Sequence, residues 1–238
     1  MSAKRTTREV LAGNPWFRAL PAALAEGILA QGLIRRMADE IVYAAGDPPN
    51  GIFALISGEI RVIQTTAEGR SALLMIASPG VWFGEAAMID GQPRSSDAVA
   101  VGQAVVLQLS PAVFRRLTSD NSQHYAAFAG LVCQQYRKAM EYIVTTANLP
   151  LPVRLAQRLV ALVQTHGRQD RGAVIIDLHL SQENLAEMVG ASRQSLNRAL
   201  KALEAKGMVS VGYSALTIRD GAALETLARS RMLPDALR

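Results

Sequence analysis

The chain has 238 residues, half of them hydrophobic, so we expect two domains, or one large one, with a real core and without dominant disorder. Its single cysteine, Cys133, excludes an internal disulfide and a cysteine cluster for zinc or an iron–sulfur centre. The net charge of +5 arises mostly in the C-terminal third, which permits nucleic-acid binding there, with an ordinary solvated surface as the alternative. The apolar runs are too short for a membrane span and no secretory signal is recognised, so we expect a cytoplasmic location and no membrane partner.

Two zones are predicted in the first half of the chain. Residues up to about 40 are expected to form short helices, because Leu20, Leu24 and Ile28 recur at helical spacing. From Ile41 to about Leu109, short β-rich runs alternate with turns that contain glycine. These glycines fall at positions 46, 51, 58, 69, 80, 84, 91 and 102. Such spacing predicts a compact antiparallel barrel or roll.

A long helix is predicted from about Asn121 to Ala147, with Gly130 as its only glycine. At about seven turns it is too long for a small roll to bury along its whole length. Its apolar stripe could pack on the roll of the same chain, or pair with the same helix of a second chain, which we expect. The stripe consists of Tyr125, Ala129, Val132, Tyr136, Met140, Ile143 and Ala147. Pro150 and Pro152 then predict a stiff hinge.

The pattern of the C-terminal region is that of a helix-turn-helix. Ser181 can cap a short helix over residues 182–189, and Ser192 can cap a second helix. Between them, Gly190 supplies the positive φ that a tight turn between helices needs. The second helix is expected to bury one face formed by Leu196, Leu200 and Leu203. After Gly207, two β-rich runs around the turn "GYS" predict a β-hairpin wing.

The exposed face of this second helix is rich in hydrogen-bond donors. A recognition helix that enters the major groove with its N-terminus can reach base edges with its first, second and sixth residues. Arginine can grip guanine and glutamine can grip adenine with two bonds, whereas Lys201, further along, is placed to meet phosphate. The alternative is a solvated helix pair in a bundle, but the caps and the basic face favour DNA. The candidate DNA-binding residues are Ser192, Arg193, Gln194, Asn197, Arg198 and Lys201.

From about residue 15 to 220, the sequence resembles the CRP/FNR family of bacterial transcription regulators. The stretch "FGEAAMIDGQPRSS" is similar to the family's phosphate-binding cassette, and "LSQENLAEMVGASRQSLNRALKALEAKGMV" to its DNA-reading unit. "GDPPNGIFALISGEIRV" matches the glycine pattern of its roll. The resemblance implies an α+β fold with an N-terminal β-roll of the double-stranded β-helix or jelly-roll type and a C-terminal winged helix-turn-helix. The implied segments are the roll (1–120), a dimerisation helix (121–147), a hinge (148–153) and the DNA-binding domain (154–238).

The resemblance also assigns roles within the cassette. It implies that Glu85, following Gly84, accepts a hydrogen bond from the ribose of a cyclic nucleotide. It implies that Arg94 neutralises the cyclic phosphate and that Ser95 donates to it, with backbone N–H groups near Glu85 as further donors. Arginine suits phosphate geometry, which supports this independently. Ser96 stands where the family commonly has alanine. The alternative is a structural ion pair between Arg94 and Glu85.

The residues that contact the base depart from the family pattern. In cAMP-responsive members, Thr and Ser bond the adenine amino group, and these positions align with Ala139 and Met140, whose side chains neither donate nor accept. In another register the role could pass to Tyr136, Tyr142, Thr145 or Thr146. The expected effector is a cyclic nucleotide, cAMP or cGMP. The alternative is a ligand-free or non-nucleotide roll that acts through a protein partner.

The DNA-reading unit departs at one position, because Gln194 replaces a Glu while Arg193 and Arg198 match the family. Since Glu accepts from cytosine and Gln prefers adenine, we predict a palindromic site related to a TGTGA half-site but altered at one base pair.

The predicted function is therefore a homodimeric DNA-binding regulator controlled by a small effector, with RNA polymerase as a further partner. We expect that the chain is not an enzyme and that it binds no metal or other cofactor. The sequence shows no pattern of a catalytic nucleophile or of metal ligands, and the histidines, at 124, 166 and 179, lie far apart.

Overall fold

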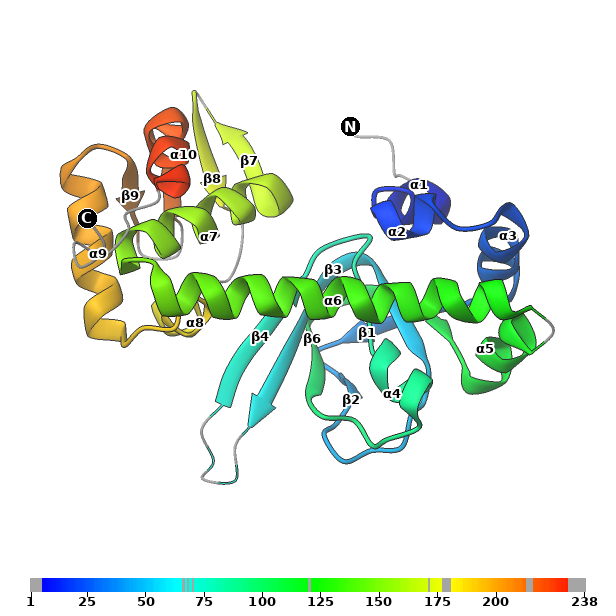
Figure 1. Cartoon of the computed structure of the whole chain (residues 1–238). Coiled ribbons are helices and arrows are strands. Elements are labelled where there is room, and N and C mark those ends of the chain that lie inside the picture. The colour runs from blue at the N-terminus through cyan, green and yellow to red at the C-terminus, as the bar shows by residue number, and fades with distance from the viewer. Residues whose placement is uncertain are drawn as a thin grey trace. The chain divides into compact units, whose positions relative to one another are not determined.

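Figure 1 shows the computed structural model of the chain, which describes residues 6–65, 67, 69, 71–119, 121–170, 172–176, 181–212 and 216–230, without the side chains of 146, 165 and 166. The chain forms two compact units, Met1–Lys138 and Ala139–Arg238. The limit between them falls inside the long helix. The four segments 1–120, 121–147, 148–153 and 154–238 stay predictions.

Three short helices open the first unit: α1 (Thr7–Leu11), α2 (Pro15–Arg18) and α3 (Ala22–Gln31). The side chain of Asn14 caps α2 by accepting from the backbone N–H of Trp16 at 2.9 Å. Leu24 and Ile28 of α3 are fully buried, as their helical spacing predicts. The helical start of the chain is therefore confirmed as far as residue 31.

The roll is a six-stranded antiparallel sheet in the order β1-β6-β3-β4, with β2 paired to β6 and β5 paired to β3. Its strands are β1 (Leu33–Ala38), β2 (Ile41–Tyr43), β3 (Ile52–Thr65), β4 (Ser71–Ala77), β5 (Trp82–Phe83) and β6 (Asp97–Leu109). The antiparallel roll predicted between residues 41 and 109 is confirmed.

Strand β1 corrects the prediction of helices up to about residue 40. It pairs with β6 from Leu33↔Gln108 to Ala38↔Gln103, at the edge of the sheet. Only Met37 of this strand is buried, so the apolar alternation that marks a strand in sequence is missing. Pairing with β6, rather than a local pattern, makes this segment a strand.

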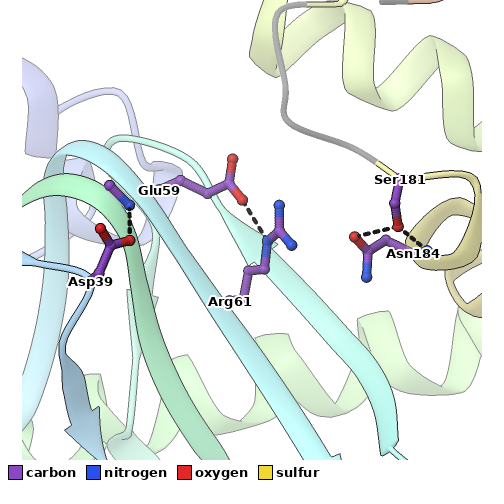
Figure 2. A network of polar contacts seen from close by, with 6 residues as sticks. Asp39, Glu59, Arg61, Ser181 and Asn184 are labelled. Carbon is purple, nitrogen blue, oxygen red and sulfur yellow. Dashed lines mark hydrogen bonds and ion pairs between the residues drawn. The ribbon is translucent and has the colours of Figure 1, made fainter. Parts of the chain in front are cut away.

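Local polar contacts brace the surface of the roll. Asp39, in the turn after β1, has a left-handed φ of 51° and accepts from the backbone N–H of Gly102 at 2.7 Å (Figure 2). On β3, Arg61 and Glu59 form an ion pair at 2.6 Å, because residues two apart on a strand share a face. These two contacts pair polar groups of the roll that lie outside its buried apolar core.

An aromatic cluster inside the roll reaches the predicted cassette. Tyr43, Phe53 and Phe83 pack with ring centroids between 5.5 and 6.2 Å apart. Each of these residues is at most 5% exposed. Because Phe83 directly precedes Gly84, the start of the cassette is anchored in this buried aromatic cluster.

After α5 (Pro111–Thr118), the chain forms one long helix, α6 (Ser122–Asn148; green in Figure 1), which confirms the helix predicted over 121–147. Phe128 and Leu131 of α6 are fully buried. Further along the predicted apolar stripe, Tyr136 is 62% exposed and Ile143 is 54% exposed. A single chain therefore leaves this part of the stripe uncovered.

The second unit begins after α6. Pro150 is the N-cap of α7 (Leu151–His166), and Pro152 lies in its first turn, where a missing N–H costs no helical hydrogen bond. The interruption predicted at Pro150 is confirmed. A four-stranded sheet in the order β7-β8-β10-β9 and three further helices follow. They are β7 (Gly167–Asp170), β8 (Ala173–Ile176), α8 (Gln182–Met188), α9 (Arg193–Ala205), β9 (Val209–Val211), β10 (Leu216–Ile218) and α10 (Gly221–Arg229).

Over the described residues, none of the helices combines the length and the apolar character that a membrane span requires.

Candidate functional site

The cassette is a tight connection from β5 through the short helix α4 (Glu85–Asp90) to β6. Gly84 starts α4 in the left-handed region, with φ 79°. A Cβ at this position would lie 2.9 Å from Nη1 of Arg94 and 3.2 Å from Cε1 of Tyr43. Position 84 therefore requires glycine both for its conformation and for the close approach of the arginine.

Arg94 is 4% exposed and lies among protein acceptors. Its Nη1 donates to the carbonyl of Gly84 at 2.5 Å, and its Nη2 donates to the carbonyl of Gly51 at 2.6 Å and to Oδ1 of Asn50 at 2.7 Å. Its Cζ lies 4.1 Å from the ring centroid of Tyr43, within cation–π distance. Its Nε is buried and has no hydrogen-bond partner among the described residues.

Burial dominates the electrostatics of this site. Burial lowers the pKa of Arg94, against the opposing effect of Tyr43 and the charge of Glu85. Burial raises the pKa of Tyr43 to about 12, although the charge of Arg94 acts in the opposite direction. Burial also raises the pKa of Glu85, while its own backbone N–H and the charges of Arg94 and Lys138 lower it.

The structure brings Glu85 and Arg94 into the same buried region, since Glu85 is 7% exposed and the charge of each affects the pKa of the other. Within the described part of the chain, no ion pair within 4 Å joins them, so the alternative of a structural ion pair is not observed. Ser96 is buried, whereas Ser95 is exposed. The effector roles of these residues stay predictions.

The two predicted base-contacting residues, Ala139 and Met140, belong to the second compact unit, and both are exposed. Their part in effector binding stays a prediction.

Sequence reasoning missed three residues of the roll site: Tyr43, Asn50 and Lys138. Asn50 lies within the stretch "GDPPNGIFALISGEIRV", which matches the family through its glycine pattern alone. Lys138 follows Gln135 by one helical turn, and the Nε2 of Gln135 donates to the carbonyl of Trp82 at 3.2 Å. This bond fixes one face of α6 on β5, and the helical spacing of Lys138 gave the available signal.

The DNA-reading unit has the local geometry that its sequence predicts. The hydroxyl of Ser181 accepts from the backbone N–H of Asn184 at 3.1 Å and caps α8 (Figure 2). Gly190 has φ 61°, as the turn between α8 and α9 requires. The hydroxyl of Ser192 caps α9 by accepting from the backbone N–H of Ser195 at 3.2 Å. The helix-turn-helix is therefore confirmed as a fold.

The two faces of α9 divide as predicted. Its buried residues include Leu196, Leu200 and Leu203, none of which is more than 2% exposed. The candidate base-reading and phosphate-binding side chains are exposed or partly exposed: Ser192, Arg193, Gln194, Asn197, Arg198 and Lys201. Nη2 of Arg198 donates to the hydroxyl of Ser195 at 3.3 Å. The contacts of these side chains with DNA stay predictions.

The wing is an antiparallel pair, β9 and β10, with the register Leu216↔Val211 to Ile218↔Val209. Oε1 of Glu204, near the end of α9, accepts from the backbone N–H of Val211 at 3.0 Å and ties the wing to α9. The hairpin predicted after Gly207 is confirmed, although most of the turn "GYS" lies outside the described residues.

Two family models match this chain. Residues 34–121 match the cyclic nucleotide-binding domain, and residues 153–227 match the Crp-like helix-turn-helix domain. Together the matches cover more than half of the chain and include the cassette and the DNA-reading unit.

Relatives and solved structures agree with these matches. A CRP-like cAMP-activated global transcriptional regulator of Mycobacterium tuberculosis is 28% identical over 79% of this chain and 84% of its own length. The Cyclic AMP receptor protein of Thermus thermophilus is 27% identical over 79% and 83%. The crystal structure of another CRP-family regulator from Thermus thermophilus superposes with a TM-score of 0.68 at 27% identity, over 82% and 97%. FixK2 from Bradyrhizobium japonicum, at 17% identity and a TM-score of 0.71 over 84% and 98%, shows the fold alone.

These relatives are transcription regulators and not enzymes, which confirms the prediction that the chain is not an enzyme. The described residues also hold no group of three or more His, Cys, Asp or Glu side chains that could bind a metal. The chain is a DNA-binding transcription regulator with a cyclic nucleotide-binding domain, and it belongs to the CRP/FNR family.

Proposed function

We propose that the chain acts as a homodimeric transcription regulator whose DNA binding is controlled by cAMP or cGMP bound in the roll. The observation that supports this most directly is a buried Arg94 and a buried Glu85 that form no ion pair with each other. Nε of Arg94 has no partner within the described chain. Both groups therefore keep hydrogen-bonding capacity for a ligand that carries a phosphate and a hydroxyl.

Each residue of the cassette has a part in this proposal. Arg94 neutralises the cyclic phosphate, and the exposed hydroxyl of Ser95 donates to it. Glu85, following Gly84, accepts from the ribose 2′-hydroxyl, and Ser96 lines the buried side of the loop. The phosphate would therefore neutralise the buried guanidinium of Arg94, and the ribose hydroxyl would give the buried carboxylate of Glu85 a hydrogen-bond partner.

The base has fewer polar partners than the sugar and phosphate. Ala139 and Met140 offer only apolar contact. Lys138, on α6, adds an exposed cation whose charge lowers the pKa of Glu85. The names of two relatives, which specify cAMP, favour cAMP over cGMP.

Dimer formation is supported by the uncovered stripe of α6, in which Tyr136, Met140 and Ile143 are 62%, 38% and 54% exposed. Pairing with the same helix of a second chain would remove these side chains from water. Two recognition helices would then read a palindromic site, with half-sites about one DNA turn apart. Arg193, Gln194, Asn197 and Arg198 would meet base edges, and Lys201 and Ser192 would meet the phosphate backbone.

Control requires the effector to bind the DNA-competent state more tightly than the other state. In the proposed sequence of events, effector binding shifts the paired helices, and the hinge at 148–153 reorients the recognition helices. RNA polymerase is the expected partner of the DNA-bound dimer.

The proposal is tested by isothermal titration of the full chain with cAMP and with cGMP, and by fluorescence anisotropy of an operator duplex with and without each nucleotide. Arg94→Ala should weaken nucleotide binding on the order of 100-fold, because it removes a charged hydrogen-bonding group. Arg8→Ala, which removes only an exposed ion pair with Glu26, is the matched control. Unchanged nucleotide affinity in the Arg94 variant contradicts the assigned role.

A second candidate is a regulator whose roll binds no nucleotide and contacts a protein partner instead. The three protein acceptors already bonded to Arg94 favour it. Operator binding that neither nucleotide changes, together with no heat of binding, would select this candidate.

A further inference from the structure

Asn50, in the loop between β2 and β3, is hydrogen-bonded to Arg94. Its Oδ1 accepts from Nη2 of Arg94 at 2.7 Å, and its Nδ2 donates to the carbonyl of Val42 at 3.3 Å. Its own carbonyl accepts from Nε2 of Gln108 at 2.8 Å. Because both ends of the side-chain amide are bonded, its oxygen points at the guanidinium.

The position of this bond on Arg94 matters for anion binding. A guanidinium carries five N–H donors and offers two forked edges, one formed by Nε with Nη2 and one by Nη1 with Nη2. Both forks therefore need Nη2. In Arg94, Nη2 donates to Asn50 Oδ1 and to the carbonyl of Gly51, which uses both of its hydrogens. The unused hydrogens, on Nε and Nη1, do not share an edge.

Of the two acceptors on Nη2, the side chain of Asn50 is the one that can yield. The carbonyl of Gly51 belongs to the backbone and moves only with the loop. The amide of Asn50 can rotate about its side-chain bonds, and because the residue is partly exposed, water can solvate it after release.

We propose that Asn50 competes with an anionic ligand for Nη2 of Arg94 and thereby sets the affinity of the roll site. A phosphate gains a two-bond grip on Arg94 only when the Asn50 amide releases Nη2. This inference deepens the proposed function and rests on it for the natural ligand. The competition between Asn50 and an anion for Nη2 should also be seen with any other phosphate that reaches Arg94.

The test depends on the direction of two substitutions at one position. Asn50→Ala removes the competing oxygen and should strengthen binding of cAMP or cGMP by on the order of tenfold, the factor for a hydrogen bond with one charged partner. Asn50→Asp places a carboxylate on Nη2 and should weaken binding tenfold or more, because a charge-assisted bond is harder to displace. If Asn50 merely held the loop in place, both variants would weaken binding, and this result would overturn the inference.

Gln108→Ala is the matched control. It removes the bond to the main-chain carbonyl of Asn50 but leaves the competing Oδ1 in place, so it should not strengthen nucleotide binding. Thermal unfolding of each variant establishes that the loop substitutions leave the protein folded.

A second readout works without any nucleotide. Inorganic phosphate at millimolar concentration should raise the melting temperature of Asn50→Ala more than that of the wild type, and should have no such effect on Arg94→Ala. If neither cAMP nor cGMP binds, but phosphate still raises the melting temperature of Asn50→Ala more than that of the wild type, the proposed effector is wrong and the competition between Asn50 and the anion stands. If phosphate stabilises Asn50→Ala no more than the wild type, the competition is wrong.

Discussion

Arg94 in the roll and the side chains on α9 are fixed by contacts of very different range. Arg94 is 4% exposed, and its three acceptors come from residues 10, 43 and 44 positions away. On α9, Arg193 and Gln194 are exposed, and the side-chain bonds of Ser192 and Arg198 reach only three residues along the helix. Residues distant in sequence therefore position Arg94, whereas the exposed side chains on α9 are positioned by the helix that carries them.

This difference has a consequence for mutation. Around Arg94, a change in the strand, the loop or the cassette alters the same guanidinium, so substitutions there should be coupled. On α9, each exposed side chain is carried by a helix that folds from its own caps and buried face. Substitutions at well-separated positions of that face should be close to additive.

The strongest test of the coupled region is Gly84→Ala. The new Cβ would lie 2.9 Å from Nη1 of Arg94, and the alanine backbone would have to keep the left-handed φ of 79°. We expect a loss of about 1–2 kcal/mol from the left-handed backbone and a further ~1–3 kcal/mol from the clash, with weaker nucleotide binding. Urea unfolding and calorimetry measure both effects.

Gly91→Ala separates the two contributions. Gly91 also has positive φ, 71°, but a Cβ there meets nothing within 4 Å. This control should show the backbone cost alone and leave nucleotide affinity unchanged. Equal losses in the two variants would show that Arg94 does not closely approach position 84.

On α9, Arg193→Ala should weaken binding to a palindromic operator by about 1–3 kcal/mol and relax the preference at one base pair. Lys201→Ala should instead weaken binding to every sequence and lower the salt slope by about one. Fluorescence anisotropy at several salt concentrations distinguishes them. A uniform loss in the Arg193 variant would assign that residue to phosphate.

A smaller effect is expected at the cap of α9. Ser192→Ala removes the acceptor for the backbone N–H of Ser195 and should cost ~1 kcal/mol of stability. Ser192→Asp restores an acceptor and should recover the stability, but its charge should weaken DNA binding through repulsion of phosphate. Recovery of stability without any change in DNA affinity would place this residue away from the phosphate backbone.

The range of these contacts also decides what the sequence could predict. The caps Ser181 and Ser192, the turn at Gly190 and the apolar face of α9 are local, so periodicity and spacing were sufficient to predict the helix-turn-helix. The sequence predicts helix where the structure has strand β1, because the conformation of this strand depends on pairing with β6, some 70 residues away.

The same reasoning applies to the candidate effector site. The cassette motif identified Glu85 and Arg94, which the structure does bring together. It could not identify Tyr43 or Asn50, because their contacts with Arg94 depend on the pairing of β2 with β6 and on how the loop before β3 folds against the cassette. Nothing in the spacing of those residues marks them as partners of an arginine more than 40 positions later.

Glu85 offers the finest test of the buried region. Burial raises its pKa above the ordinary value of 4.5, although its backbone N–H, Arg94 and Lys138 act in the opposite direction. The folded state therefore holds this proton more tightly than the unfolded state. The stability linked to it is fully present below pH 4.5 and is lost as the pH rises through the raised pKa.

Glu85→Gln removes the buried charge but keeps the shape of the side chain. We expect a slightly higher melting temperature than that of the wild type at pH 7, a difference that disappears below pH 4.5, and weaker nucleotide binding at the same time. Asp90→Asn, an exposed isosteric change on the same helix that keeps an acceptor for Gln92, should do neither. A higher stability together with weaker nucleotide binding is the result expected if Glu85 serves the ligand. In that case its buried charge lowers the stability of the folded protein but contributes to nucleotide binding. A variant less stable at pH 7 would instead make Glu85 part of the scaffold that positions Arg94.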